Sequence, residues 1–553
     1  MLQNSYLNRV DSAGKQQGMN FECNPPSKTN RVMKRDNLIK RLSNQASQFD
    51  MVVIGGGATG LGIALDAATR GYSVVLFEQS DFTKSTSSRS TKLVHGGVRY
   101  LAQGDVRLVT EALRERGLLL RNAPHLCHNQ PFIIPAYHTW EIPFYTSGLT
   151  MYDILAGKLS LGRSRYLSRN GVILHLPTLK QRGLKGGTLY YDGQFDDSRL
   201  GVNLMQSILE HNGIALNYMR VESFIKNGKG RIRGVVVRDC INDVEHEVRA
   251  VNVVNATGVF VDEIMSMDSP EHQAMVRPSQ GVHLTLPKEF LPGDAALMIP
   301  RTDDGRVLFA VPWYDKVIVG TTDTVVPNST LEPTALESEI EFILTTAGRY
   351  LQQAPQHSDV LSTFAGLRPL AAPKEGDKST KEISRNHKII VSPSGLITIV
   401  GGKWTTYRQM AQDVVDRAEV VAGISHRPCT TTNLKIHGYS ESVDPTDPLG
   451  FYGFDVLAIR EMTITEPTLS ELLDKEYPYI AAQVVWAVEQ EMAQHIEDFL
   501  ARRIRILFLD ARASLRMAPK VAQIMARLLK KDKQWIDSEV ASYEKLASNY
   551  IIN

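Results

Sequence analysis

Short apolar runs alternate with a helical pattern between residues 50 and 79 of the chain. The run Asp50–Ile54 predicts a buried strand, and the helical pattern that follows it ends near Gly71. A second apolar run, Val74–Phe77, predicts another strand and leads directly into Glu78. Because a strand, a helix and a second strand of these lengths form a βαβ unit, the pattern predicts a doubly wound α/β fold.

The remaining patterns divide the chain into segments of different character. Alternating runs between residues 276 and 330 predict an antiparallel sheet that packs as a second layer. Two late runs, Val253–Gly258 and Ile397–Gly402, end in small-residue turns and predict returns of the chain to the first sheet. Other helical patterns cover residues 105–121, 149–160, 196–211 and 335–353, and other strand-like runs cover residues 131–136, 214–221, 231–238 and 246–254.

Together these segments predict an α/β fold class, with a Rossmann-type domain, an inserted antiparallel sheet and a C-terminal all-α domain. The Rossmann-type domain and its insertion cover residues 49–430. The stretches of the Rossmann-type domain itself are about 49–125, 190–270 and 355–430, the antiparallel layer covers about 126–189 and 271–354, and the helical domain covers 431–553.

Residues 1–48 are expected to form a disordered, basic N-terminal extension. Residues 1–30 are polar, whereas residues 31–42 carry five Arg or Lys side chains against one Asp. The second stretch is interpreted either as a solvated helix or as a basic contact with a membrane surface. Met33 is also a possible natural start of the protein.

Composition excludes several classes of protein. The formal net charge of +2 over 553 residues gives no global attraction to nucleic acid. Cys23, Cys127, Cys240 and Cys429 lie far apart and form no C-x-x-C pair, so neither a disulfide framework nor a metal site is predicted, and a reducing compartment fits best. No apolar run is long enough to predict a transmembrane helix.

The glycines of the first turn have the spacing of a dinucleotide-binding site. Gly55, Gly57 and Gly60 stand in the order G-x-G-x-x-G between the predicted strand and helix. The first glycine permits the tight turn, the second permits close approach of a pyrophosphate, and the third permits close packing of helix on strand. The N–H groups of Ala58 and Thr59 lie at the helix N-terminus, where they can bind phosphate, and the Glu78 carboxylate can accept hydrogen bonds from a ribose.

Four further motifs carry a resemblance to a known family. They are TSSRSTKLVHGGVRYL (Thr86–Leu101), GLRPL (Gly366–Leu370), SRNH (Ser384–His387) and GGKWTTYR (Gly401–Arg408). In this order they resemble the flavin-dependent glycerol-3-phosphate dehydrogenases, over roughly residues 33–550. Trp404 departs from the pattern, which has a smaller aliphatic residue there, and is expected to alter ring packing without changing the reaction.

The resemblance implies an FAD-binding Rossmann-type domain, an antiparallel substrate layer and a helical C-terminal domain. It also implies a reaction, in which sn-glycerol 3-phosphate is oxidised to dihydroxyacetone phosphate, FAD is reduced and electrons pass to membrane quinone.

A dianionic phosphate monoester with a secondary alcohol requires cations, and planar Arg suits phosphate. Arg99, Arg368, Arg385 and Lys403 all stand in matched motifs. By resemblance, Arg368 and Arg385 hold the phosphate, while Lys403 and Arg99, beside Tyr100, lie nearer the flavin and the substrate.

Loss of the substrate's C2 proton requires a base, and a neutral histidine is suited to this near pH 7. His283 resembles the family's active-site histidine. His95 is the rival, but its VHGG context favours contact with the flavin. Catalytic roles are therefore assigned to His283, Arg368 and Lys403.

The remaining candidates for cofactor binding are assigned by motif. Thr322 and Asp323 are weaker candidates for the substrate edge. N–H groups of the turn before residue 407 are plausible donors to reduced flavin. The cofactor set also contains Ser87, Ser88, Ser90, His95, Gly96, Gly97, Ala256, Thr257, Gly258, Gly402, Lys403, Thr405 and Thr406.

Three other functions remain open at this point. An oxidase of the same family would pass electrons to oxygen and form peroxide. A flavoenzyme that oxidises amines or amino acids would share the glycine fingerprint but need a carboxylate clamp. A non-enzymatic scaffold that binds RNA or membrane is supported only by the basic N-terminal segment.

The partners expected for the dehydrogenase are sn-glycerol 3-phosphate, membrane quinone and a membrane surface, without nucleic acid. We expect a cytoplasmic protein held peripherally on the inner face of the cell membrane. Residues 31–42 and apolar surface on the helical domain are the candidate docking elements. The family also suggests a homodimer.

Overall fold

The structure is a computed structural model that describes residues 34–43, 48–102, 104–302, 305–371, 387–444 and 446–552. Met33–Asn553 form one compact unit, and everything below concerns that unit. Cys23, Arg385 and most of the expected N-terminal extension lie outside the described residues.

The first sheet is the predicted nucleotide-binding sheet. Its strands lie in the order β17-β18-β10-β1-β2-β7, and β9 pairs with both β8 and β10. The neighbours from β18 to β7 are parallel, as the predicted βαβ pattern requires. The strands are β1 (Phe49–Ile54), β2 (Val74–Phe77), β7 (Ile214–Leu216), β8 (Met219–Lys226), β9 (Ile232–Asp239), β10 (Val244–Asn255), β17 (Lys388–Val391) and β18 (Leu396–Val400).

Helices cover this sheet, and as a result every residue of β2 and most of β1 is buried. Helix α2 (Ala58–Thr69) packs against both α7 (Asp197–Glu210) and α10 (Tyr407–Ala422). Asp196 caps α7, since its carboxylate accepts the Arg199 N–H at 3.1 Å. The short α8 (Val261–Asp268) follows the turn after β10.

The second sheet is the predicted antiparallel layer. Its order is β15-β11-β14-β13-β12-β4-β6-β3, with β16 beside β11 and β5 beside β6. Only the β4–β12 pair is parallel among the strand pairs that the structure describes in this sheet. The strands are β3 (Leu93–Val94), β4 (Cys127–Ala136), β5 (Arg165–Ser168), β6 (Gly186–Phe195), β11 (Val276–Pro287), β12 (Ala296–Ile299), β13 (Leu308–Trp313), β14 (Lys316–Gly320), β15 (Thr324–Val325) and β16 (Ser362–Ala371).

The boundaries between the two layers differ from the prediction at three strands. β3 and β16 lie in stretches assigned to the nucleotide-binding part, yet both pair in the second sheet. β6 crosses the predicted boundary at residue 190. The reason is that a strand belongs to the sheet in which it pairs. The apolar pattern of a single strand does not show which other strand it will pair with.

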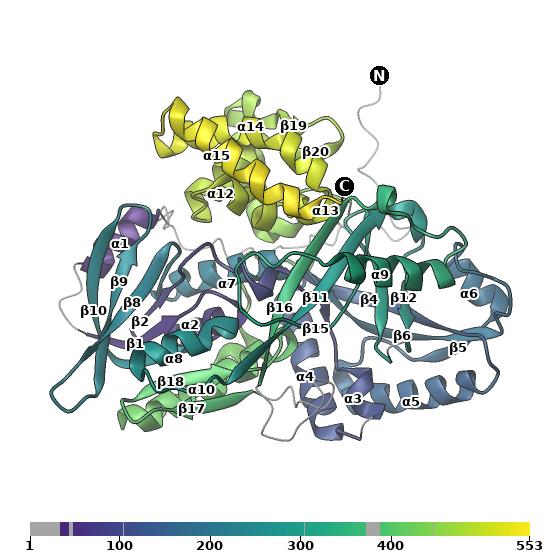
Figure 1. Cartoon of the computed structure of the whole chain (residues 1–553), viewed down its shortest axis with the longest axis horizontal. Helices are drawn as coiled ribbons and strands as arrows, with labels where there is room; N and C mark the ends of the chain where they lie inside the picture. Colours follow the sequence, from purple (N-terminus) through teal and green to yellow (C-terminus); the bar gives the residue numbers. More distant parts are fainter. Residues whose placement is uncertain are drawn as a thin grey trace, which may run out of the picture. The chain divides into compact units, whose positions relative to one another are not determined.

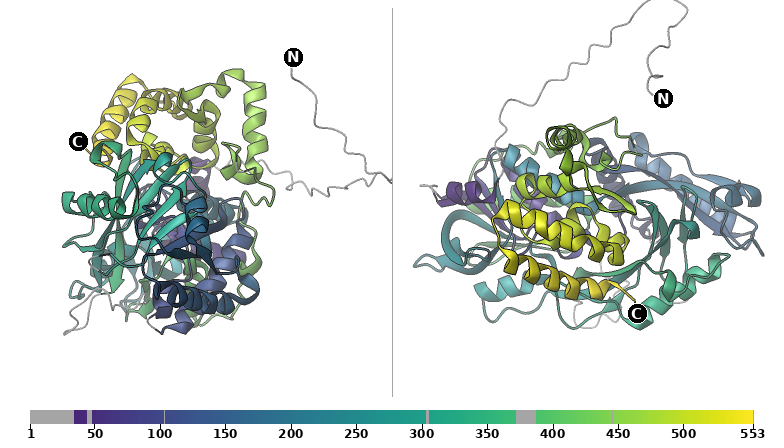
Figure 2. Two further views of the ribbon diagram at one scale, coloured as in Figure 1. Left: turned by 90° about the vertical axis from the view of Figure 1, so that its right-hand side faces the viewer. Right: turned by 90° about the horizontal axis from the view of Figure 1, so that it is seen from above.

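Helices surround the second sheet, and a helical domain follows it. Figures 1 and 2 show α3, α4 and α5 on the side of the sheets opposite the yellow C-terminal helices. The helices of this layer are α3 (Val98–Ala102), α4 (Val106–Asn122), α5 (Glu141–Ala156), α6 (Arg169–His175) and α9 (Glu337–Tyr350). The C-terminal helices are α11 (Val456–Thr465), α12 (Ala481–Gln490), α13 (Ile506–Leu509), α14 (Ala511–Leu529) and α15 (Lys533–Ala547), with a π-helical turn, η11, at Asp498–Arg503.

The predicted fold class is confirmed: two mixed or antiparallel sheets are followed by a mainly helical domain. The all-α description needs one addition, a small hairpin of β19 (Leu472–Asp474) and β20 (Tyr477–Ile480).

The expectation of disorder is wrong for residues 35–43, which form α1 (Arg35–Ser43) in the folded body. Leu38 and Leu42 are buried in the core that contains the first sheet. The Arg35 guanidinium pairs with Asp239 at 2.7 Å, and both side chains are buried. Leu38 and Leu42 of the candidate docking segment are therefore already covered by protein.

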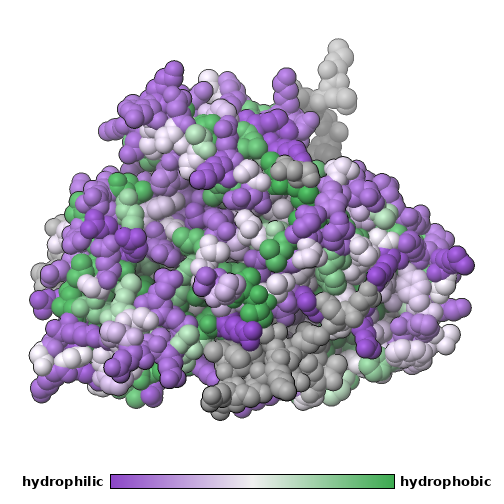
Figure 3. Space-filling view, in the orientation of Figure 1, coloured by the Kyte–Doolittle hydropathy of each residue, from purple (hydrophilic) through white to green (hydrophobic). Residues whose placement is uncertain are grey.

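One face of the molecular surface can be judged from Figure 3. The face drawn in Figure 3 is mostly hydrophilic, with apolar patches scattered over it. Among the described residues, no helix combines the length and the apolar character needed to cross a bilayer.

Candidate functional site

The glycine turn after β1 has no room for side chains at two positions. A Cβ on Gly55, where φ is +109°, would lie 2.7 Å from the Ala256 carbonyl oxygen. A Cβ on Gly60 would lie 1.8 Å from the Gly55 oxygen, far inside van der Waals contact. The turn therefore holds α2 and β1 as close together as the sequence spacing predicted.

The N-terminus of α2 opens into a pocket. The Ala58 N–H donates to Ser87 Oγ at 2.9 Å, so the serine side chain lies directly at the helix N-terminus. Gly57 and Thr59 line the same pocket. Such a helix end is suited to bind phosphate, because its first N–H groups have no partner within the helix.

Glu78 is fixed at the end of β2. Its Oε2 accepts the Gly56 N–H at 2.6 Å and its Oε1 accepts the Ser80 N–H at 2.9 Å. Burial raises the pKa of the Glu78 carboxyl, although these two hydrogen bonds oppose the shift. The carboxylate therefore has a defined orientation on the wall of the pocket, where it can accept bonds from ribose hydroxyls.

Two neighbouring pockets form the candidate site. The first pocket is lined by the ends of β1 and β2, by residues 83–87, by residues 256–260 and by residues 401–404. The second pocket lies against β11 and β16 of the other sheet. The two pockets share their lining at Thr86, Pro369, Gly401, Gly402, Lys403 and Trp404, so they lie side by side, and the pair is called the groove below.

Most of the sequence-predicted site residues line this groove. In the first pocket these are Gly55, Gly57, Ala58, Thr59, Glu78, Ser87, Ala256, Thr257, Gly258, Gly402 and Lys403. In the second pocket these are Ser90, His95, Tyr100, His283, Arg368, Gly402, Lys403 and Thr405.

Five further predicted residues that the structure describes do not line either pocket. Gly60 lies beneath the turn, and Gly96 donates its N–H to the Tyr152 hydroxyl at 2.7 Å. Gly97 has a left-handed backbone, with φ at +80°. Ser88 and Thr406 are buried, and their hydroxyls donate to nearby carbonyls. The Arg99 side chain and all of Arg385 lie outside the described part of the chain.

His283 is a buried histidine on β11. Its Nε2 lies 2.9 Å from Thr91 Oγ1, and its ring stacks on Phe364 with centroids 5.0 Å apart. Its Nδ1 is also buried, and none of the described residues forms a hydrogen bond with it. Burial lowers the pKa of His283 well below its ordinary value, and the positive charges of Arg368 and Lys92 add to this shift. The ring is therefore neutral near pH 7.

A buried ion pair, which the sequence did not predict, lies behind this histidine. Lys92 Nζ is 2.8 Å from both carboxylate oxygens of Asp197 and donates to the Ser88 carbonyl at 2.6 Å. Burial lowers the pKa of Lys92, and Asp197 opposes that shift. The Ser90 hydroxyl donates to Asp197 at 2.7 Å, so this serine braces the pair. Asp197 is 105 residues away from Lys92, and no local motif connects them.

Arg368 is held by several acceptors at the second pocket. Its guanidinium donates to Thr321 Oγ1 and the Thr322 carbonyl, both at 3.0 Å, and lies 3.3 Å from the Asp323 carboxylate. About a fifth of the side chain, 21%, stays exposed. Thr322 and Asp323 were weak candidates for the substrate edge; here they orient this arginine.

Lys403 and Trp404 connect the turn before α10 to the rest of the groove. Lys403 Nζ lies 5.2 Å from the centre of the Tyr100 ring. The Trp404 indole donates to the Ser87 carbonyl at 2.8 Å. Its ring also makes edge contacts with Phe195 and Tyr407. The unexpected tryptophan therefore connects the turn before α10 to the 83–87 segment and to β6.

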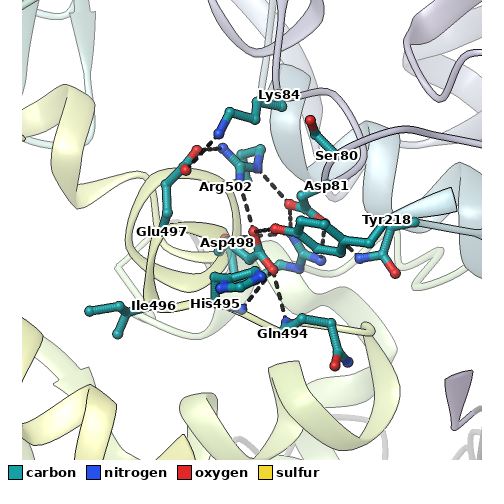
Figure 4. Close-up of polar contacts among 12 residues, drawn as sticks. Ser80, Asp81, Lys84, Tyr218, Gln494, His495, Ile496, Glu497, Asp498 and Arg502 are labelled. Atoms are coloured by element: carbon teal, nitrogen blue, oxygen red, sulfur yellow. Dashed lines mark hydrogen bonds and ion pairs between the residues drawn. The ribbon is translucent and has the colours of Figure 1, made fainter. Parts of the chain in front are cut away.

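The C-terminal domain reaches the first pocket through a buried ionic network (Figure 4). Lys84 lines that pocket and pairs with Glu497 at 2.8 Å. Arg502, on the π-helical turn, pairs with Glu497, Asp498 and Asp81. The sequence signal was three arginines within the apolar stretch at residues 499–509, because buried arginines require acidic partners.

Comparison with known proteins decides the family. Residues 50–408 match the family described as FAD dependent oxidoreductase, and residues 396–536 match the C-terminal domain of alpha-glycerophosphate oxidase. The chain is 38% identical to a probable mitochondrial glycerol-3-phosphate dehydrogenase of Caenorhabditis elegans, over 94% of this chain and 77% of the relative. The chain belongs to the FAD-dependent glycerol-3-phosphate dehydrogenase family.

Two further members of the family support this assignment. The mitochondrial glycerol-3-phosphate dehydrogenase of Arabidopsis thaliana is 39% identical, over 88% of this chain and 84% of its own. The glycerol-3-phosphate dehydrogenase of Bacillus halodurans, solved as a complex with FAD, superposes with a TM-score of 0.77 and 30% identity. That comparison covers 94% of this chain and 98% of the other. The resemblance recognised in the sequence motifs is confirmed.

Proposed function

We propose that this protein binds FAD and oxidises sn-glycerol 3-phosphate to dihydroxyacetone phosphate. The observation that carries the proposal is the groove, in which a pocket at a dinucleotide-type turn lies beside a pocket with a buried neutral histidine and an arginine. The relatives named glycerol-3-phosphate dehydrogenase support the substrate, and the FAD complex of the Bacillus halodurans protein supports the cofactor.

The groove residues fit an FAD molecule. Close backbone approach is possible at Gly57, and phosphate can face the helix N-terminus at Ala58 and Thr59, where Ser87 Oγ accepts the Ala58 N–H in this structure. Glu78 is oriented for the adenosine ribose. When bound, FAD supplies the hydride acceptor of the reaction. The other residues that we assign to its binding are Gly55, Gly60, Ser87, Ser88, Ser90, His95, Gly96, Gly97, Ala256, Thr257, Gly258, Gly402, Lys403, Thr405 and Thr406.

The substrate occupies the second pocket in this proposal. The Arg368 guanidinium binds the phosphate because its plane is already fixed by Thr321 and Asp323. Lys403 and Tyr100 lie where the two pockets meet and position the three-carbon chain beside the flavin. Arg99 and Arg385 complete the set of cations by resemblance to the family.

His283 removes the proton from the C2 hydroxyl. A base must be neutral before the reaction, and burial together with the cations Arg368 and Lys92 keeps the imidazole in that form. The contact between Nε2 and the Thr91 hydroxyl restrains the ring. The positive charge of Lys403 stabilises negative charge as it develops nearby.

Anaerobic titration with sn-glycerol 3-phosphate tests this function directly. The purified yellow protein should lose its flavin absorbance when the substrate is added, and glycine or sarcosine should leave the spectrum unchanged. A protein that stays colourless after reconstitution with FAD, or a flavin that this substrate does not reduce, would contradict the proposal.

Quinone is the electron acceptor that we propose, and oxygen is the second candidate. The match to the C-terminal domain of alpha-glycerophosphate oxidase favours including oxygen in the test. Turnover with a soluble quinone but with little peroxide identifies the dehydrogenase. Stoichiometric peroxide would identify the oxidase.

We also propose peripheral attachment to the inner face of the cell membrane, because quinone is dissolved in the bilayer. Cell fractionation tests this location: the protein should sediment with membranes at low salt and be released without detergent by high salt. A homodimer is the proposed assembly, and sedimentation equilibrium measures its mass.

A further inference from the structure

Thr91 stands between two residues that bind the same buried carboxylate. Ser90 and Lys92 both bond to Asp197, through the serine hydroxyl at 2.7 Å and the lysine amine at 2.8 Å. The Lys92 N–H also donates to Ser90 Oγ at 3.0 Å, and the Lys92 backbone is left-handed, with φ at +61°. The position of Thr91 is therefore fixed from both sides by bonds within the protein.

The Thr91 side chain lies where His283 meets the second pocket. Its Oγ1 is 2.9 Å from His283 Nε2, and both residues line the pocket. The imidazole is almost closed to the pocket, because His283 is only 2% exposed, whereas Thr91 is half-buried. A molecule in the pocket therefore meets the threonine hydroxyl before it meets the ring nitrogen.

The other sides of the imidazole are covered. Phe364 stacks on one face, with ring centroids 5.0 Å apart, and a Cβ on Gly320 would lie 2.3 Å from the imidazole Cδ2. Nδ1 is buried and has no hydrogen-bond partner among the described residues. Within the part of the chain that the structure describes, the Thr91 hydroxyl is therefore the one hydrogen-bonding contact of the two ring nitrogens.

The proposed phosphate site and the histidine lie on the same face of β11. A Cβ on Gly281 would lie 2.3 Å from the guanidinium of Arg368, which stands on the neighbouring strand β16 (Figure 1). Gly281 and His283 are two positions apart, and such positions are separated by about 7 Å along a strand. Glycerol 3-phosphate can bridge this distance, because two carbon atoms lie between its phosphoester oxygen and its C2 hydroxyl.

We propose that Thr91 is a catalytic residue that relays the proton of the substrate's C2 hydroxyl to His283. This inference rests on the proposed function and adds one step to it. A hydroxyl has one proton to donate and two lone pairs that accept, so Thr91 Oγ1 can donate to Nε2 while it accepts the C2 hydroxyl. None of the described residues forms a second hydrogen bond with Thr91 Oγ1, which leaves a lone pair for the substrate.

The relay moves two protons and one hydride. The C2 hydroxyl proton passes to Thr91 Oγ1 as the Thr91 proton passes to His283 Nε2, so the threonine is unchanged and the imidazole becomes positively charged. The electron pair of the broken O–H bond forms the second bond of the carbonyl group, and the hydrogen on C2 leaves as hydride to FAD. His283 is still the final proton acceptor, although its ring need not touch the substrate.

The alternative role for Thr91 is to brace the ring. In that arrangement Nε2–H donates to Thr91, and Nδ1 must accept the substrate proton. Nδ1 is buried and has no contact with a hydrogen-bonding group among the described residues, whereas Nε2 contacts a residue of the pocket lining. The geometry therefore favours the relay through Nε2.

Substitutions that change the hydroxyl test the relay in the full-length, FAD-loaded protein. Thr91→Val keeps the shape of the side chain, so the rate of flavin reduction by saturating sn-glycerol 3-phosphate, measured anaerobically by stopped flow, should fall by about 100-fold. Thr91→Ser should restore most of the wild-type rate. Thr91→Ala should fall between the two, because water can enter the vacated polar space and replace the hydroxyl.

The matched control is Thr363→Val. Thr363 precedes Phe364 on β16 and is buried, and its hydroxyl has no hydrogen-bond partner among the described residues. Removing that hydroxyl should leave the flavin reduction rate unchanged. The flavin spectrum of each variant, and its reduction by dithionite, verify that the protein is folded and holds FAD.

Two measurements distinguish a relay from a brace. ¹⁵N NMR of the imidazole in the oxidised wild type, assigned with His283→Gln, should show a proton on Nδ1 and none on Nε2. In mixtures of H₂O and D₂O, the wild-type rate should decrease along a curve because two protons move together, and the Thr91→Val rate should decrease along a straight line. A proton on Nε2, or a straight line in the wild type, would reduce Thr91 to a brace.

The outcomes separate this inference from the proposed function. If glycerol 3-phosphate does not reduce the wild-type flavin, the proposed function is wrong and the relay with it. If the wild type is reduced and Thr91→Val is equally fast, or Thr91→Ser is as slow as Thr91→Val, the relay alone is wrong. If Thr91→Val purifies without FAD, the wild-type NMR spectrum and the serine and alanine variants decide.

Discussion

His283 lies on β11 between two neighbouring strands, with Phe364 stacked on its ring. A Cβ on Gly320 of the adjacent strand would lie 2.3 Å from the imidazole Cδ2. The ring thus has protein on both sides, and only groups in the second pocket remain as new partners for it. Burial of the His283 ring therefore both restricts its movement and keeps it neutral.

Replacing His283 by Gln tests its role as the base. The variant keeps a polar side chain of similar length but loses the proton acceptor, so flavin reduction by glycerol 3-phosphate should slow by about 100-fold or more. Stopped-flow absorbance measures that rate, while the bound flavin spectrum should stay normal. His272→Gln, on a partly exposed histidine paired with Asp262, is the control and should have little effect. Equal rates in wild type and His283→Gln would disprove the assignment.

The lowered pKa of His283 predicts the pH dependence of the same rate. The base is active when unprotonated, and burial moves its pKa below the ordinary value of about 6.5. At saturating substrate, the flavin reduction rate should therefore stay constant as pH falls to about 6.5 and decline only below that. A midpoint of the acid decline above that pH would show that the histidine is solvated.

Gly60 shows how a single missing Cβ determines cofactor binding. Gly60→Ala places a methyl group 1.8 Å from the Gly55 oxygen, so helix α2 must move away from β1. We expect this variant to purify with little FAD and to be less stable by about 1–3 kcal/mol. Gly228→Ala is the control, since its Cβ would meet no atom within 4 Å. Flavin content and urea denaturation distinguish the two variants.

At the scale of elements, the π-helical turn η11 connects the helical domain to the loop after β2. The Asp81 carboxylate accepts bonds from Arg502 Nε at 2.5 Å and from Arg503 Nη1 at 2.6 Å, and all three side chains are buried. Burial alone would raise the pKa of Asp81, but the two arginines hold it well below its usual value. Buried charges of this kind are costly to separate because each loses its partner in a medium of low polarity.

Asp81→Asn should therefore destabilise the protein by about 3–5 kcal/mol, since it removes the charge of a carboxylate that two buried guanidinium groups share. Arg502 keeps its pairs with Glu497 and Asp498, whereas Arg503 keeps only the more distant Glu491, at 3.7 Å. Urea denaturation of the holoenzyme measures the change. Asp243→Asn is the control: Asp243 also pairs with an arginine, Arg238, but its side chain is 83% exposed. Exposed pairs contribute roughly 0–1 kcal/mol, so this variant should resemble the wild type. Similar decreases in the free energy of unfolding in both variants would mean that burial of the Asp81 network does not add to stability.

At the scale of the whole molecule, the groove lies between two sheets whose strands alternate along the chain. Residues of the first sheet's strand ends, the 256–260 turn and the 401–404 turn all meet at the first pocket. A ligand that fills this groove contacts segments from widely separated parts of the sequence. Its binding therefore stabilises the folded arrangement of both layers together.

Removal of FAD should lower the unfolding temperature of the entire protein. At FAD concentrations about 100 times the dissociation constant, binding adds about 2.7 kcal/mol to the stability of the folded state. Differential scanning fluorimetry of deflavinated protein should show a melting temperature that rises with added FAD. Added FMN, which lacks the adenosine that Glu78 is oriented to bind, should raise it less. A melting temperature independent of FAD would contradict binding in the groove.

Local sequence determined those features that depend on neighbouring residues alone. The βαβ unit, the glycine turn and Glu78 are contained within thirty consecutive positions, 50–79, and the structure has them as predicted. The family resemblance also indicated His283 and Arg368, which the fold brings to one pocket. Short-range steric and hydrogen-bonding rules are enough for such features.

The tertiary structure alone decided everything that depends on long-range pairing. The Lys92–Asp197 pair, the Asp81–Arg502 network and the membership of β16 in the second sheet join residues up to several hundred positions apart. The exposure of a side chain was also decided by the tertiary structure. Helices α1 and α5 both contain apolar residues, but packing buries Leu38 and leaves Ile154 on the surface. Which partner or solvent a side chain meets is a property of the folded chain, because burial depends on elements that lie far away in sequence.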